Sequence, residues 1–102
     1  MKNKQIVLKA VEYLHTLDTD TEITTCQLLD CIFGLREEHG GKYWVGTSCL
    51  SMADMFEIDS GIRKEAVKSG LMIDTSKYEN AVMGLPFHIP YGVKKKEIEQ
   101  RV

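Results

Sequence analysis

The sequence predicts a small α+β domain in which three to four helices precede a β-hairpin or short antiparallel sheet, an order that is winged-helix-like. Apolar residues recur at helical spacing over residues 4–33 and 49–70, and from residue 71 they alternate with a period of two. The chain has 102 residues, of which 43% are hydrophobic and 27% charged, as in ordinary globular proteins. We therefore expect residues 1–102 to form a single domain, with residues 1–3 and 97–102 frayed at its ends.

Two helices are predicted in the first third of the chain. Residues 4–17 place their apolar side chains on one stripe, as an amphipathic helix does. Thr24 and Gln27 form the T-x-x-Q pattern of a capping box, and Gly34 is a suitable residue just after a helix. A second, shorter helix is therefore predicted over residues 25–33.

The middle of the chain has no clear period. Residues 35–48 contain Gly40 and Gly41, which favour a turn, and Tyr43 and Trp44, which favour a strand. An exposed loop and a small hairpin are both compatible with this composition.

Residues 49–70 are predicted to form two short helices joined by a tight connection. Ser51 can cap the first, and Ser60 can cap the second. Residues 57–59 interrupt the apolar pattern between them, and Gly70 is a suitable residue to end the second helix.

Strands are predicted after residue 70. Residues 71–75 and 87–93 alternate apolar and polar side chains, and residues 81–83 can add a further short strand. Because Pro90 has no backbone N–H, the strand over 87–93 is expected at a sheet edge. Residues 94–102 are expected to form a charged tail.

The charge is unevenly distributed along the chain. The formal net charge is −2, but residues 1–59 carry −5 and residues 60–102 carry +3. Such asymmetry between halves indicates an anionic partner for the basic half.

The stretch Leu50 to Leu71, LSMADMFEIDSGIRKEAVKSGL, resembles a helix-turn-helix followed by the start of a wing, as in the winged helix-turn-helix superfamily. Ala53 stands where the two helices of the motif would approach each other, and Ile58 where an apolar turn residue would enter the core. In this comparison, residues 4–17 correspond to the first helix of the domain and residues 71–93 to the wing.

The resemblance implies a DNA-binding or regulatory protein in which the second helix of the motif enters the major groove of duplex DNA. It implies a homodimer, joined through the first helix or the tail. The plainer interpretation of the basic residues is a solvated helix face and a solubilising tail. The residues implied to contact DNA are Ser60, Arg63, Lys64 and Lys68 on the helix, and Lys77, Lys94, Lys95 and Lys96 in the wing region.

A second hypothesis is a non-catalytic protein–protein interaction module of similar fold with no role in nucleic-acid binding. Its contact surface would be Tyr43 and Trp44, since exposed aromatic residues are enriched at binding hot spots, or the β-edge over residues 84–91. The alternative is that the two aromatic residues close the core and that the β-edge packs against the helices.

No motif indicates an enzyme, a metal site or a cofactor. The spacings typical of zinc ligands do not occur, and Glu38, His39 and Cys49 would need the fold to bring them together. Three cysteines, Cys26, Cys31 and Cys49, are predicted to be reduced thiols. No apolar run is long enough for a membrane span and the first residues do not form a signal peptide, so we expect a cytoplasmic protein.

Overall fold

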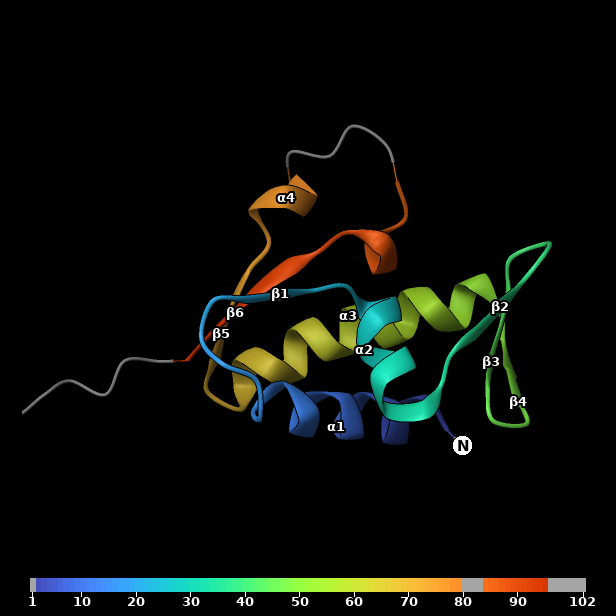
Figure 1. Cartoon of the computed structure of the whole chain (residues 1–102), viewed down its shortest axis with the longest axis horizontal. Coiled ribbons are helices and arrows are strands. Elements are labelled where there is room, and N and C mark those ends of the chain that lie inside the picture. The colour runs from blue at the N-terminus through green and yellow to red at the C-terminus, as the bar shows by residue number, and fades with distance from the viewer. Residues whose placement is uncertain (1, 80–83, 96–102) are drawn as a thin grey trace, which may run out of the picture.

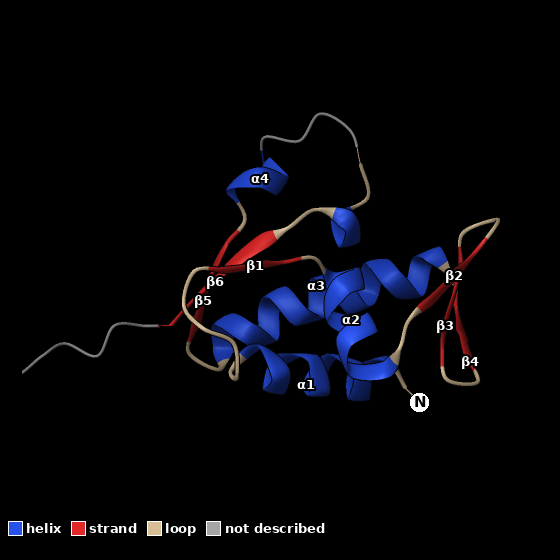
Figure 2. Cartoon of the chain, viewed as in Figure 1, coloured by secondary structure: helices blue, strands red, loops and turns tan. Residues whose placement is uncertain are grey.

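A computed structural model describes residues 2–79 and 84–95 (Figure 1). Over these residues the chain forms four α-helices and two three-stranded antiparallel sheets, which confirms the predicted α+β class (Figure 2). The helices are α1 (Asn3–Leu14), α2 (Thr25–Phe33), α3 (Met52–Lys68) and α4 (Ser76–Glu79), with a 3-10 turn η1 (Pro86–His88). The strands are β1 (Thr21–Ile23), β2 (Arg36–Glu38), β3 (Lys42–Val45), β4 (Ser48–Leu50), β5 (Leu71–Asp74) and β6 (Tyr91–Lys95).

The two sheets lie at different places around the helices. The first has the order β1-β6-β5 and runs alongside α3, whereas the second, β2-β3-β4, lies at the N-terminal end of α3 (Figure 1). In the first sheet Val93 of β6 is paired with Thr21 on one side and Ile73 on the other, so β6 is the central strand.

The edge position predicted from Pro90 is wrong because β6 begins at Tyr91, one residue after the proline. The missing N–H therefore falls outside the hydrogen-bonded ladder. The predicted strand over 87–93 is likewise shorter than expected, since its first residues form η1.

The core is built between α1, α2, α3 and the inner faces of both sheets. The α1 stripe is buried as predicted, although the helix ends at Leu14 and not at residue 17. Helix α1 lies alongside α3 (Figure 1). Their close approach leaves little room at Gly61, where an added Cβ would lie 2.9 Å from Val7 Cγ2. The largest fully buried side chains are Tyr43, Tyr91, Phe87, Ile6, Leu14, Leu28, Leu29, Met55, Ile58, Ile62, Val93 and Thr25.

Two predicted helix starts are confirmed by their caps. The backbone N–H of Gln27 donates to Thr24 Oγ1 at 3.0 Å, and the N–H of Thr24 donates to Gln27 Oε1 at 2.9 Å. The Ser51 and Asp54 side chains form the same reciprocal arrangement at the start of α3. Gly34 follows α2 with φ of 72°, a left-handed conformation that glycine adopts without steric cost.

The prediction of two short helices over 49–70 is wrong, because residues 52–68 form one continuous helix. The residues expected to interrupt it are internal to α3. Ile58 is fully buried, Asp59 is a buried residue with partners on α2 and α3, and Gly61 faces Val7 of α1. The helix-turn-helix expected within residues 50–71 is therefore absent.

The stretch over 35–48 contains the hairpin that composition allowed. Gly40 and Gly41, with φ of 86° and 74°, form the turn between β2 and β3, and β4 completes a three-stranded sheet. The further strand predicted over 81–83, and residues 96–102 of the predicted tail, lie outside the described residues.

Candidate nucleic-acid interface

Three of the residues predicted to contact DNA lie on one side of α3. Ser60, Lys64 and Lys68 are spaced by four residues, so they form a single stripe along the helix, and all three are exposed. Within the part of the chain that the structure describes, the Ser60 hydroxyl and the Lys64 ammonium have no hydrogen-bond or ion-pair partner. Lys68 Nζ lies 3.6 Å from Glu65 Oε1 in a solvent-exposed pair, which contributes little energy. We call these three residues the α3 stripe.

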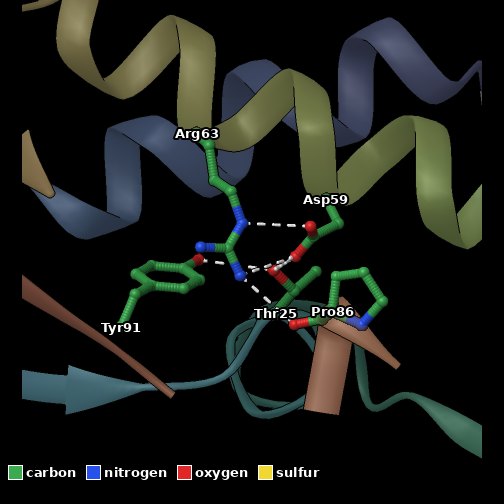
Figure 3. A network of polar contacts seen from close by, with 5 residues as sticks. All are labelled: Thr25, Asp59, Arg63, Pro86 and Tyr91. Carbon is green, nitrogen blue, oxygen red and sulfur yellow. Dashed lines mark hydrogen bonds and ion pairs between the residues drawn. The ribbon is translucent and has the colours of Figure 1, made fainter. Parts of the chain in front are cut away.

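Arg63 does not belong to the stripe, which corrects its predicted outward position. Its side chain is only 16% exposed, and its Nε donates to Asp59 Oδ2 at 3.0 Å. Its Nη2 donates to the Pro86 carbonyl oxygen at 3.2 Å (Figure 3). The guanidinium carbon also lies 4.7 Å from the ring centre of Tyr91 and 5.1 Å from that of Tyr78. Arg63 is thus engaged within the protein.

The partners of Arg63 form a buried polar network. Thr25 Oγ1 donates to Asp59 Oδ1 at 2.7 Å, so the Asp59 carboxylate is held from both α2 and α3 (Figure 3). Burial raises the pKa of Tyr91 to about 12, which keeps the phenol beside this carboxylate protonated. Through these contacts α2, α3, η1 and β6 share one set of polar interactions, which lies on the inner side of α3 together with its buried apolar residues.

The wing-region lysines lie beside carboxylates. Lys77 Nζ is 2.8 Å from Glu22 Oε2. Lys94 is exposed and stands opposite Met72 in the β5–β6 ladder, on the face of the sheet that points away from the core. The pKa of Asp74 is lowered chiefly by the backbone N–H of Ser76, with smaller contributions from Lys94 and Lys77.

Lys94 nevertheless lies toward the C-terminal end of the stripe, although it is far from Lys68 along the chain. Since β5 begins three residues after α3 ends, and β6 ends opposite the start of β5, Lys94 lies at the end of the first sheet where α3 terminates. Lys95 is the last residue of β6 and pairs with Leu71, and Lys96 lies outside the described residues.

Tyr43 is not a surface contact residue, which corrects the role that the interaction hypothesis gave it. Its side chain is 1% exposed, its ring meets Phe87 edge-on, and its hydroxyl lies 3.4 Å from Glu37 Oε1 and 3.2 Å from His88 Nε2. Trp44 points to the other side of β3 and is half-buried, with the Arg36 guanidinium 5.8 Å from its ring centre. Tyr43 therefore belongs to the core.

The cysteines and histidines do not form a metal-binding group in the described residues. No group of three or more His, Cys, Asp or Glu side chains is placed there to hold a metal ion, the set Glu38, His39 and Cys49 included. Burial, followed by the negative charge of Glu37, raises the pKa of Cys26 to about 12, so this thiol is protonated at neutral pH.

Sequence reasoning missed Asp59 and Thr25, the residues that orient α3. The available signal was the Asp59–Arg63 pair at i,i+4, which lies next to the apolar stripe of a helix.

In the part of the chain that the structure describes, no helix combines the length and the apolar character needed to cross a bilayer. Comparisons with protein-family models, with curated proteins and with solved structures found no match to this chain.

Proposed function

We propose that this protein binds duplex DNA through the α3 stripe, as a winged-helix-like domain with an inserted three-stranded sheet. The observation that carries the proposal is the juxtaposition of an exposed helix face, bearing two lysines and a serine, with the antiparallel pair β5–β6 that follows that helix directly. The order helix, strand, helix, helix, strand, strand, with β1 joining β6, supports the same arrangement once the sheet β2-β3-β4 and the short turns α4 and η1 are set aside.

The stripe has dimensions that suit a groove of DNA. Ser60 and Lys68 are eight residues apart, which corresponds to about 12 Å along a helix and to three or four base steps. A major groove about 12 Å wide admits one helix. Lys64 would contact a phosphate or a guanine edge, and Lys68 would contact a phosphate. Lys94 would add a contact to the sugar–phosphate backbone of the DNA.

Two acidic residues of α3, Glu57 and Glu65, lie next to the stripe on the side that faces α1. Glu57 and Glu65 line a groove between α3 and α1, together with Asn3 and Lys4 of α1. Glu57 accepts a hydrogen bond from Asn3 Nδ2 at 3.1 Å, which draws it toward α1, whereas Glu65 pairs with Lys68 of the stripe at 3.6 Å. DNA on the stripe would therefore have to take Lys68 from this exposed pair, which contributes little energy. The overall net charge of −2 reduces long-range attraction but leaves local phosphate contacts possible.

The proposal is tested by fluorescence anisotropy with a random duplex across a salt series. About three phosphate contacts predict a slope of about −2.7 in log affinity against log salt, and a homodimer that contacts DNA with both copies would give about −5. Replacing Lys64 and Lys68 together by Gln should reduce the slope by about two.

The matched control replaces two exposed lysines remote from the stripe, Lys9 on α1 and Lys42 on β3, by Gln. This variant has the same net charge as the stripe variant and should keep the wild-type slope. Equal losses in both variants would mean that α3 is not the contact surface. Absence of wild-type binding at low salt would refute DNA binding altogether.

A further inference from the structure

A cavity of about 300 Å³ lies beside the α3 stripe and is bordered by α3, α4 and η1. This volume is at the lower end of the range for small-molecule sites, so it suits a ligand with a single ring. Its wall is formed by Phe56, Asp59, Ser60, Arg63 and Lys64 from α3, Tyr78 from α4 and Pro86 from η1.

Two half-exposed aromatic rings stand on opposite elements of this cavity. Phe56 is 43% exposed and Tyr78 is 44% exposed, so part of each ring is open to a ligand. Both rings are supported on another side. Phe56 meets Phe87 edge-on at 5.3 Å, and the Arg63 guanidinium lies 5.1 Å from the centre of the Tyr78 ring. Each ring is thus fixed by a contact on one side and borders the cavity on another. Two such aromatic rings favour a planar ring as ligand.

The charges around the cavity leave one cation without a counter-ion. Asp59 and Arg63 neutralise each other at 3.0 Å, and Asp59 also accepts a hydrogen bond from Thr25. Lys64 has no ion-pair partner in the described part of the chain, and the adjacent Ser60 hydroxyl has no hydrogen-bond partner there. A carboxylate at the rim would meet both groups.

We propose that this cavity binds a small planar aromatic carboxylate. The ring lies between Phe56 and Tyr78 against Pro86, and the carboxylate accepts hydrogen bonds from Lys64 Nζ and Ser60 Oγ. The site does not depend on DNA binding, because all of its contacts come from this chain and from the ligand. An occupied site would, however, engage two residues of the α3 stripe.

The test is a titration of the ¹⁵N-labelled protein with benzoate and, separately, with benzamide, followed by two-dimensional NMR. Benzamide has the same ring and nearly the same shape but no charge. Benzoate should bind saturably and about fivefold more tightly than benzamide, the factor expected for one exposed ion pair. The amide shifts should be confined to residues 56–64 and to Tyr78.

Variants separate the charge from the ring contacts. Lys64→Gln should abolish the preference for benzoate and leave benzamide binding unchanged, whereas Tyr78→Ala should weaken both ligands about fivefold. Lys68→Gln is the control, since Lys68 lies one turn further along α3 and does not line the cavity. Equal binding of the two ligands by the wild type, or an equal effect of Lys68→Gln and Lys64→Gln, would overturn the proposal. So would shifts scattered over the whole chain.

Discussion

Replacing Arg63 by Met tests whether this residue serves the fold or the surface. The substitution keeps an unbranched side chain but removes the guanidinium and its hydrogen bonds to Asp59 and Pro86. It leaves Asp59 Oδ2 without its partner at 3.0 Å on a side chain that is only 6% exposed.

The expected cost follows from these contacts. Removing one partner of a buried ion pair costs about 3–5 kcal/mol, because the remaining charge is left uncompensated. Arg63 is 16% exposed, so water can reach part of the site, and we expect the lower end of that range, about 3 kcal/mol. For a domain of this size, such a loss lowers the melting temperature by about 15 °C.

The assay is urea unfolding followed by circular dichroism, with Lys64→Met as the control. Lys64 is the next residue along α3, but it is exposed, so its replacement should change stability by less than about 0.5 kcal/mol. Adding Asp59→Asn to Arg63→Met should cost less than the sum of the two single changes, by at least about 1 kcal/mol, since the two side chains interact directly. Additive effects, or a cost for Arg63→Met no larger than for Lys64→Met, would refute the buried role of Arg63.

Three further predictions concern other sites. Gly61→Ala should destabilise the protein by about 1–3 kcal/mol in urea unfolding, because the new Cβ would lie 2.9 Å from Val7 Cγ2. The loss should shrink in a Val7→Ala background, and an undiminished loss there would contradict the steric explanation. Asp54→Asn should cost about 1 kcal/mol at neutral pH through the α3 cap. Hydrogen bonds from Ser51 and Asn3 lower the pKa of Asp54, so its carboxylate stabilises the fold above the ordinary pKa of 3.8, and this contribution is lost as pH falls through the lowered value. Unfolding curves at neutral and strongly acidic pH should therefore differ between variant and wild type only at neutral pH. Because burial raises the pKa of Cys26 to about 12, alkylation by iodoacetamide at about pH 8 should be at least tenfold slower at Cys26 than at the exposed Cys49, as measured by peptide mass spectrometry. Equal rates would show that the Cys26 thiol is accessible and ionises normally.

The helix starts were predictable because their determinants are local. The caps of α2 and α3 each use side chains three residues apart, Thr24 with Gln27 and Ser51 with Asp54. The α1 stripe is equally local, since it depends only on the spacing of apolar residues within one helix. Such patterns require no knowledge of which distant segment lies nearby.

The continuous α3 was not predictable by the same reasoning. The residues Asp59, Ser60 and Gly61 have the composition of a turn, but two of them have partners far away in the sequence. Asp59 accepts from Thr25, and Gly61 faces Val7 of α1. Both residues are suited to a helix interior only because those neighbours are present. Local sequence patterns therefore predict two helices where the chain forms the single helix α3.

The network around Asp59 also gives different roles to basic residues that the sequence analysis assigned to one DNA-contacting surface. Arg63 and Lys64 are adjacent, yet a rotation of about 100° per residue directs one toward β6 and the other toward solvent. Substitution of Arg63 should therefore change the free energy of unfolding, whereas substitution of Lys64 and Lys68 should change the affinity for DNA. Measured below its melting temperature, Arg63→Met should bind DNA with the wild-type salt slope, because it removes no exposed cation. The stripe variant should show the reverse, with normal unfolding and a reduced slope. If Arg63→Met lowered the slope while still folded, the phosphate contacts would extend to the buried side of α3, and the assignment of the interface would have to change.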